Sequence, residues 1–400
     1  MAERPRKATC SLADTVAAAG IEAYHKGLAA AGLEHSANTV LAAFVVCDGE
    51  GAPPVVVAWG AGTKFITMGE IEDDVGGERV RDGHAEVLAR RALLLYFHRQ
   101  LCAAVSASPG GSIFEVGPAV AAFRLRPGVV LHFYTSSQPC GNATVKRWAK
   151  GAPEPAVEAG ELELPTLPPH TPVHFCAVAE GQVAVLVKSD GVDAEPHALP
   201  PANALVPGVP PRPVLEGFIM SCSDKIARWN ALGLQGGLLS RLLPAPLTLA
   251  SITVGRKFTR LHTERALCCR LADFCPDRRR SLAAIPGQPY GVHHPTLLQT
   301  SVKLDVGMVD DSGAVFTPNC LVWSFGDAAP EVLDGGKAAG GTVSLFSRAA
   351  MLASWRGVMA AVGGEPAAKA ASGMTYGAAK ATSPTYVAAR AILVQDPSMF

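Results

Sequence analysis

Short apolar runs alternate along this chain with segments whose apolar residues recur every third or fourth position. Residues 40–47 and 55–59 are apolar runs on either side of Asp-Gly-Glu-Gly, a turn-like sequence, and they predict two strands. From residue 83 to about 104 the spacing is helical, and residues 129–134 are again a continuous apolar run. A short helix is expected from about 142 to 150. The first part of the chain is therefore expected to fold as strand, strand, helix, strand and helix.

The same kind of alternation resumes further along the chain. The predicted elements are a helix just after Cys222, a strand over 247–254, a helix from about 259 to 274, a strand over 320–325, and helices over about 343–362 and 376–394. Strands that alternate with helices predict an α/β fold with the strands in a central sheet.

Residues 151–213 interrupt this pattern, because they are rich in proline, alanine and glycine. Such a composition buries too little apolar surface to order a long segment. We therefore interpret 151–213 as a partly disordered insertion that encloses one hairpin at 173–188. There is no internal repeat and no clean boundary between the halves, so the prediction is a single domain over residues 1–400 with this insertion.

Composition and charge add two limits to this picture. The chain has 400 residues, of which 48% are hydrophobic, and this is ample for a packed core. Lysine plus arginine (35) equal aspartate plus glutamate (35), so the overall charge predicts no partner. Any binding of nucleic acid must therefore use local basic patches.

Export and membrane insertion are not expected from this sequence. Residues 1–7 are charged and lack the apolar core of a signal peptide behind them. The longest strongly apolar run, 40–47, is much shorter than the roughly 20 residues that span a bilayer. Ten cysteines without the spacing of a disulfide framework are typical of reduced thiols. We expect a soluble protein of the cytoplasm or nucleus, with no membrane partner and no obligate protein partner.

Three short motifs carry the candidate chemistry: His84-Ala-Glu86, Pro-Cys140-Gly and Ser-Cys222-Ser-Asp-Lys. One imidazole and two thiolates can hold zinc and leave the fourth tetrahedral position open for water, as in a catalytic site. A glutamate beside that water can pass its proton to a departing amine. Taken singly, His84 also suits a helix cap, and either cysteine suits a small buried hydrophobic position. Together they predict a hydrolytic nucleobase deaminase.

The second cysteine departs from the common arrangement, in which it follows the first by three residues. That position is Ala143 here, so the second thiolate must come from a distant segment. Cys222 stands just before a predicted helix, whose N-terminal dipole favours a thiolate. If Cys140 and Cys222 share one metal ion, the two halves of the chain form one unit.

The sequence Ser-Cys-Ser-Asp-Lys-Ile-Ala-Arg-Trp-Asn at residues 221–230, with Leu-Gln-Gly behind it, resembles the core of the adenosine-to-inosine RNA deaminase family. The similarity extends from about residue 20 to the end of the chain. It implies a cytidine-deaminase-like α/β domain of three layers, with a mixed central sheet flanked by helices. It also implies that His84, Cys140 and Cys222 bind zinc, and that Glu86 is the proton shuttle.

The family includes double-stranded-RNA editing enzymes and tRNA adenosine deaminases. The editing enzymes normally carry separate RNA-binding modules upstream, whereas the deaminase-like region here begins almost at the first residue. We therefore expect the tRNA branch, which implies as substrate adenosine 37, next to the anticodon of alanine tRNA. A deaminase of double-stranded RNA or of free nucleosides, and an inert RNA-binding scaffold that has kept the fold, are the alternatives.

The resemblance also implies inositol hexakisphosphate held inside the domain. Near the C-terminus a tyrosine, a base, a second tyrosine and a second base reproduce the family's spacing. So many cations in one core need a polyanion, because an unpaired buried charge is strongly destabilising. Taken singly, these residues also suit solvated helix faces. The expected ligands are Arg90, Arg91, Lys225, Arg228, Trp229, Lys337, Tyr376, Lys380, Tyr386 and Arg390.

Asp82 lies two residues before His84 and is expected to orient a zinc ligand, as carboxylates behind metal-binding histidines do. By resemblance, Asp82 and Lys225 also relay polarity from the polyphosphate to the zinc site. The alternative is a plain loop aspartate. The insertion holds no convincing copy of the Arg-Thr-Lys type stretch or the glycine-rich loop of the family, so no base-flipping residue is assigned.

The remaining clusters have weaker chemical signals. Cys268, Cys269 and Cys275 are more typical of helix packing than of a metal site, and the pair His293-His294 is more typical of a surface loop. The candidates for contact with tRNA phosphates, which also suit a merely solvated basic face, are Arg256, Lys257, Arg260 and Arg278 to Arg280.

Overall fold

The computed structural model describes residues 11–34, 39–49, 51–64, 66, 68–106, 111–117, 122–140, 143, 221–243, 245–269, 290–305 and 320–394. Its strands are β1 (Leu41–Asp48), β2 (Val55–Ala61), β3 (Phe114–Val116), β4 (Phe123–Leu125), β5 (Val129–Ser137), β6 (Ser251–Arg256), β7 (Thr296–Gln299), β8 (Cys320–Ser324), β9 (Glu331–Asp334) and β10 (Lys337–Ala338). Strands β3 and β4 pair as a separate hairpin.

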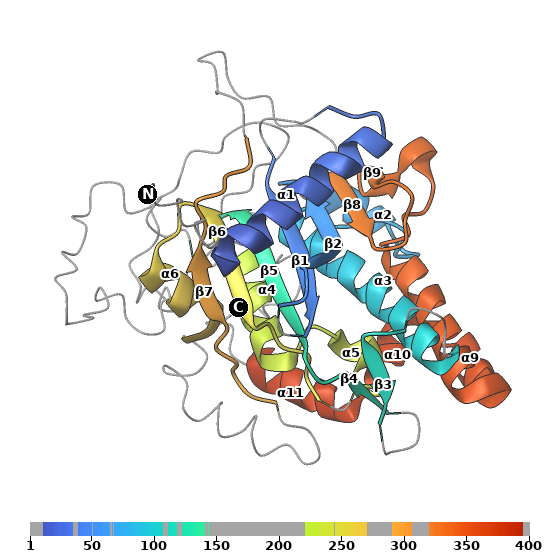
Figure 1. Cartoon of the computed structure of the whole chain (residues 1–400). Helices are drawn as coiled ribbons and strands as arrows, with labels where there is room; N and C mark the ends of the chain where they lie inside the picture. The colour runs from blue at the N-terminus through green and yellow to red at the C-terminus, as the bar shows by residue number, and fades with distance from the viewer. Residues whose placement is uncertain are drawn as a thin grey trace, which may run out of the picture.

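The other strands form one eight-stranded sheet in the order β10-β9-β8-β2-β1-β5-β6-β7 (Figure 1). Neighbours from β10 to β5 are antiparallel, whereas β5, β6 and β7 are parallel. Because β2 and β5 are both antiparallel to β1, β2 runs in the same direction as the parallel strands. The carboxyl ends of β2, β5, β6 and β7 therefore lie at one edge, which we call the catalytic edge.

Helices lie on both sides of this sheet. They are α1 (Leu12–Ala30), α2 (Met68–Asp73), α3 (Ala85–Ser106), α4 (Cys222–Leu232), α5 (Gly236–Leu239), α6 (Arg260–Glu264), a π-helical turn (Arg265–Cys269), a 3-10 turn (Ala339–Gly341), α9 (Arg348–Ser372), α10 (Tyr376–Ala381) and α11 (Pro384–Val394). Helix α1 covers one face of the sheet, and α3, with α9 packed against it, covers the other (Figure 1).

The alternation of side chains along β1 explains these layers, because successive residues of a strand point to opposite faces. Leu41, Ala43 and Val45 belong to the core cluster under α1. Their neighbours Phe44 and Val46 belong to the larger core cluster under α3. Both sides of the strand are thus buried. The predicted cytidine-deaminase-like α/β fold, with its mixed sheet between helices, is confirmed.

Several predicted elements are present with small changes at their ends. The strands β1, β2, β5 and β8 and the helices α3 and α4 agree with the sequence patterns. The strand predicted over 247–254 begins only at Ser251, because Leu247 forms hydrogen bonds with Leu234 and Gln235 instead of with a strand. The helix α1 and the strands β3, β4, β7, β9 and β10 were not predicted.

The two late helices differ more from the prediction. Helix α9 begins at Arg348, where Ser347 accepts a hydrogen bond as N-cap, and not near residue 343. The single helix predicted over 376–394 is wrong, because α10 and α11 are separate. The break has a local cause: Pro384 disfavours helical backbone at the residue before it. Tyr376 and Tyr386 therefore lie on different helices.

Some predictions fall on residues that the structure does not describe. The helix at 142–150, the hairpin at 173–188 and the insertion at 151–213 lie outside the described residues, so the single domain with this insertion stays a prediction. The helix predicted from 259 to 274 is described as far as Cys269. Within the described part of the chain, no helix is both long and apolar enough to cross a membrane.

Candidate active site and cation-lined cavity

The motif residues come together where α3 and α4 begin. His84 precedes the first residue of α3, and Glu86 lies in its first turn. Cys222 is the first residue of α4, and Ser221 caps this helix through a reciprocal arrangement with Asp224. Cys140 follows β5 at the catalytic edge. These residue types therefore stand at helix N-termini or at a strand end, where backbone N–H groups favour anions.

Cys140 and Cys222, which lie far apart in the sequence, are in direct contact. The backbone N–H of Cys222 donates to the Cys140 sulfur at 3.3 Å, and the N–H of Ser223 donates to the Cys140 carbonyl at 3.1 Å. A hydrogen bond from the Cys222 thiol lowers the pKa of Cys140, against the effect of burial, and nearby His84 lowers it further. Cys140 is therefore the more readily ionised of the two thiols.

His84 is held by a carboxylate on its own loop. Its backbone N–H donates to Oδ1 of Asp82 at 3.0 Å, and its Nδ1 lies 2.8 Å from the same oxygen. Burial disfavours the imidazolium, but Asp82, Cys140 and Glu86 raise the pKa of His84 to about 9. The surroundings of the ring are thus strongly anionic. Where Nδ1 donates to Asp82, a neutral ring presents its lone pair at Nε2, the arrangement common for metal-binding histidines.

Asp82 also forms an ion pair with Lys225 on α4 through its other oxygen. Burial opposes ionisation, yet Lys225 and His84 lower the pKa of the Asp82 carboxyl far below its usual value. The predicted link from Lys225 through Asp82 to His84 is therefore present as a chain of contacts.

Glu86 is 3% exposed. Burial raises its pKa, although His84 and a hydrogen bond that involves the Cys222 thiol act in the opposite direction. A carboxyl group with a raised pKa exchanges protons more readily near neutral pH. The position and environment of Glu86 thus suit a group that takes up and returns a proton.

These donors suit zinc by their chemistry, since they are one imidazole and two thiols in an anionic pocket. Within the described residues, however, no group of three or more His, Cys, Asp or Glu side chains is spaced as a metal site. Zinc coordination by His84, Cys140 and Cys222 therefore stays a prediction.

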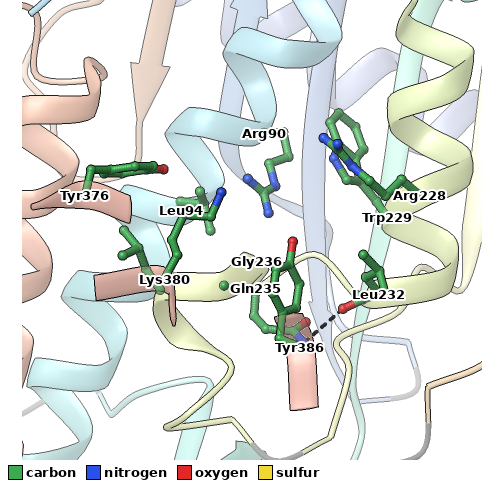
Figure 2. Close-up of a pocket in the computed structure, with 13 residues that line it drawn as sticks. Arg90, Leu94, Arg228, Trp229, Leu232, Gln235, Gly236, Tyr376, Lys380 and Tyr386 are labelled. Atoms are coloured by element: carbon green, nitrogen blue, oxygen red, sulfur yellow. Dashed lines mark hydrogen bonds between the residues drawn. The ribbon is translucent and has the colours of Figure 1, made fainter. Parts of the chain in front are cut away.

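A cavity lies between α3, α4, α10 and α11 (Figure 2). It contains about 480 Å³ of space free of protein atoms, part of it open to solvent. None of its thirteen described lining residues is acidic. The lining includes six of the predicted polyphosphate ligands: Arg90, Arg228, Trp229, Tyr376, Lys380 and Tyr386.

The cations of this cavity repel one another, and its described lining residues include no carboxylate. Burial, reinforced by Arg228, Arg390 and Arg90, lowers the pKa of Lys380 to about 7. Burial likewise lowers the pKa of Arg90 to about 10. The Nε atom of Arg90 is buried without a hydrogen-bond partner in the described structure. Such a set of groups is strongly unfavourable without an anion, so the cavity fits a polyanionic ligand.

The backbone at Gly236 lies close to the Arg90 side chain, which lines this cavity. Its guanidinium lies 5.8 Å from the Trp229 ring centre and donates to the carbonyl of Leu234 at 2.7 Å. A Cβ atom on Gly236 would lie 2.6 Å from the Arg90 guanidinium, and Gly236 has a positive φ of 63°. Gln235 and Gly236, from the Leu-Gln-Gly sequence behind the 221–230 motif, are therefore part of the cavity wall.

The other predicted ligands are not among the described residues that line the cavity. Arg390 is exposed on α11 but affects the pKa of Lys380 and Arg228. Arg91 donates to the carbonyl of Phe346 at 2.6 Å, and Lys225 is paired with Asp82. Lys337 lies on β10, at an end of the sheet.

The sequence patterns missed Arg348, the first residue of α9. Burial, Arg81 and Arg91 lower its pKa, and its charge in turn lowers that of Lys380. It therefore belongs to the same group of cations. No spacing of residues in the sequence predicted that Arg348 belongs to this group, because its position results from the packing of α9 against α3.

Two layers of helices on a mixed sheet, with a histidine–glutamate pair and two cysteines at one edge, define a deaminase-type site. Consistent with this, the chain belongs to the adenosine-deaminase (editase) domain family, whose profile matches residues 58–397. The family resemblance of residues 221–230 is thereby confirmed.

The similar proteins fall into two groups. The chain is 32% identical to the double-stranded RNA-specific adenosine deaminase of Mus musculus over 66% of this chain and 21% of that protein. It is 28% identical to the double-stranded RNA-specific editase Adar of Drosophila melanogaster, over 89% of this chain and 48% of that protein. It is also 28% identical to tRNA-specific adenosine deaminase 1 of Mus musculus, over 50% of this chain and 54% of that protein. The matched regions thus span from a fifth to about half of these relatives.

Proposed function

We propose that this chain is a hydrolytic adenosine deaminase of RNA that converts adenosine 37 of alanine tRNA to inosine. The observation that carries the proposal is the convergence of His84, Glu86, Cys140 and Cys222 at one edge of an adenosine-deaminase domain. An inert scaffold would have no need to keep a buried glutamate beside two thiols and a histidine.

His84, Cys140 and Cys222 would hold zinc, which when bound supplies a water molecule of lowered pKa. Membership of the family and the anionic surroundings of His84 support this assignment. Asp82 keeps the imidazole oriented, and Lys225 keeps Asp82 ionised.

Glu86 moves the protons of the reaction. It accepts a proton from the attacking water, and a bond forms between that oxygen and C6 of the adenine. Glu86 delivers this proton to N1, then accepts the remaining proton from the new hydroxyl group on C6 and passes it to the amino group. The bond between C6 and that nitrogen breaks, and ammonia leaves. The products are inosine and ammonia, so the atoms of adenosine and one water are all accounted for. Unpaired bases of an anticodon loop would enter such a site at lower cost than bases of a helix.

Inositol hexakisphosphate is the ligand that we propose for the cavity between α3, α4, α10 and α11. The acid-free lining, the lowered pKa of Lys380 and the unpartnered Nε of Arg90 support a polyanion there. Mass spectrometry of the denatured purified protein should detect an inositol phosphate in about equimolar amount. Protein that releases none would contradict this assignment.

Double-stranded RNA is the second candidate substrate, because relatives named for double-stranded RNA reach 33% identity, similar to the 31% reached by those named for tRNA. Purified protein should be incubated separately with total tRNA and with a long RNA duplex, and inosine mapped by sequencing. Inosine at position 37 of alanine tRNA supports the first proposal, and inosine only in the duplex supports the second. Zinc-loaded protein that leaves both RNAs unchanged would sink both proposals.

A further inference from the structure

We propose that Arg256, Lys257 and Arg260, which we call the basic segment, form a docking site for the phosphate backbone of the RNA substrate. The inference rests on the proposed function and adds to it the surface that holds the substrate beside the site. Arg256 is the last residue of β6, and Lys257 and Arg260 follow it, so three cations occupy five positions. No acidic residue lies between them and Glu264.

The basic segment lies at the catalytic edge, next to the loop that carries Cys140. Strand β6 is parallel to β5, and Arg256 is in register with Ser137. The backbone N–H of Gln138 donates to the carbonyl of Arg256 at 3.0 Å. Only one residue separates Gln138 from Cys140. Ligands of α/β sheets bind outside the carboxyl ends of parallel strands, and this is where the segment stands.

Side-chain hydrogen bonds fix the basic segment relative to that loop. The Gln138 amide donates to the Thr263 hydroxyl at 2.7 Å and to the Ala143 carbonyl at 3.1 Å. Thr263 in turn donates to the carbonyl of Thr259 at 2.7 Å. A phosphate bound by the segment would therefore be held at a set position relative to Cys140.

The basic segment reaches the surface at the end of β6. Arg256 has a buried Nε atom without a hydrogen-bond partner in the described structure. Arg260 pairs with Glu264 at 2.9 Å, but its side chain is 66% exposed, so the pair is weak and a phosphate can compete for the guanidinium. Lys257 is exposed at the end of the strand.

The rest of the catalytic edge supports an anionic partner. Lys64 follows β2, and Lys303 follows β7. Asp14, which accepts hydrogen bonds from Thr300 and Ser301, and Asp305, which follows β7, are carboxylates near this edge. Together with the basic segment, the cations outnumber these two carboxylates. Because an RNA base that reaches Glu86 brings its flanking phosphates over this edge, charge complementarity favours the RNA backbone as the occupant.

The test uses the full chain with Lys257→Asn and Arg260→Gln combined. Asparagine suits the left-handed backbone of Lys257, whose φ is 61°, so the fold should be preserved. The control, Lys369→Asn, removes an exposed cation from α9, away from β6. Binding of total tRNA is measured by fluorescence anisotropy over a series of salt concentrations, with zinc content and circular dichroism as checks of folding.

Loss of two phosphate contacts should make the fall of log affinity with log salt concentration less steep, by about 1.4 to 1.8 in the slope. The control should keep the wild-type slope, and Lys257→Arg with native Arg260 should bind like wild type. Wild-type slope and affinity in the double variant would overturn the docking proposal. The binding measurement does not depend on turnover. A wild-type protein that deaminates no RNA would overturn the proposed function. The binding slopes would still show whether the basic segment holds the RNA backbone.

Discussion

Asp82 connects the two functional regions of this protein through its two carboxylate oxygens. Oδ1 holds His84, and Oδ2 is paired with Lys225 on α4, the helix that one turn further along contributes Arg228 and Trp229 to the cavity. A rotation of α4 that moved Lys225 would leave a buried carboxylate without its partner, which is strongly unfavourable. The orientation of His84 therefore depends on how α4 is packed.

The assigned role of Glu86 makes Glu86→Gln the sharpest change in the site. The amide has nearly the same size but cannot accept the proton of water, so the rate of inosine formation should fall by roughly 10²–10⁴-fold or more. Zinc content, measured by atomic spectroscopy, should stay the same, because Glu86 is not a predicted ligand. Glu365→Gln, on an exposed part of α9, is the matched control and should keep full activity. Near-normal turnover in Glu86→Gln would refute the role.

At this scale the sequence was informative wherever chemistry sits in a local motif. His84 and Glu86 are two residues apart on one helix start, and Lys225, Arg228 and Trp229 share a helix with Cys222, so their neighbourhood follows from short spacing. Arg348 could not be found in this way. Its charge reaches Lys380 only because α9 and α10 meet in the folded chain.

Among the elements, the contact between α3 and α9 contains a buried histidine. His98 on α3 is 2% exposed, its Nδ1 lies 2.8 Å from the Ser354 hydroxyl on α9, and its Nε2 has no partner in the described structure. Burial lowers the pKa of His98 to about 3. The folded protein therefore excludes the imidazolium.

This histidine predicts a loss of stability in acid. At pH values between the ordinary pKa of histidine, about 6.5, and the pKa of His98 in the folded protein, the unfolded chain binds a proton that the folded chain does not. The free energy of unfolding should therefore fall as pH falls, by about 1.4 kcal/mol per pH unit from His98 alone. Urea unfolding of wild type and His98→Gln from pH 7 to pH 4.5 measures this. The variant should lose stability less steeply, whereas His25→Gln, on the exposed side of α1, should follow wild type. Parallel curves for wild type and His98→Gln would contradict the prediction.

The start of α5 gives a second prediction at the scale of elements. Gly236→Ala would place a Cβ atom 2.6 Å from the Arg90 guanidinium and force a left-handed backbone on alanine, so we expect a loss of about 1–2 kcal/mol in the free energy of unfolding. Gly357→Ala is the opposite case, since no atom lies within 4 Å of its added Cβ in α9. That change should stabilise the protein by about 0.5–1 kcal/mol. Equal effects of the two changes in denaturant unfolding would show that the cavity wall tolerates a side chain.

Elements with strong and continuous patterns were predictable, and those that depend on neighbours were not. Strands β1 and β5 are long apolar runs, so their burial on both faces is visible in the sequence. Strands β9 and β10 are short and lie at the sheet end, where β9 pairs with β8 and β10 pairs with β9, and this pairing decides their conformation. The break between α10 and α11 had a local signal in Pro384, which the helical spacing of the apolar residues concealed.

For the whole molecule, the cavity between α3, α4, α10 and α11 is where the C-terminal helices meet the helices that carry the candidate active site. Lys380→Met gives a prediction whose sign depends on the ligand. With a polyanion bound, removal of an attracting cation should lower the free energy of unfolding by about 1.5–3 kcal/mol. Without one, the same change would relieve repulsion from Arg228, Arg390 and Arg90 and would raise it.

Denaturant unfolding of the purified variant decides between these signs. Lys369→Met, an equivalent change at an exposed position of α9, should have almost no effect and controls for the substitution itself. Stabilisation by Lys380→Met would show that the cavity holds no polyanion, and it would contradict the ligand that we propose.

The sequence alone determined the alternation of strands and helices, the class of fold and the residue types available for deaminase chemistry, because these depend on spacing along a few turns or on one strand. Only the tertiary structure brought the Cys140 sulfur to the N-terminus of α4, joined Asp82 to Lys225, and gathered cations from α3, α4, α9, α10 and α11 around one cavity. The reason is physical: contacts between distant segments depend on how whole elements pack, and that packing is shared among many apolar residues with no signature of its own in the local sequence.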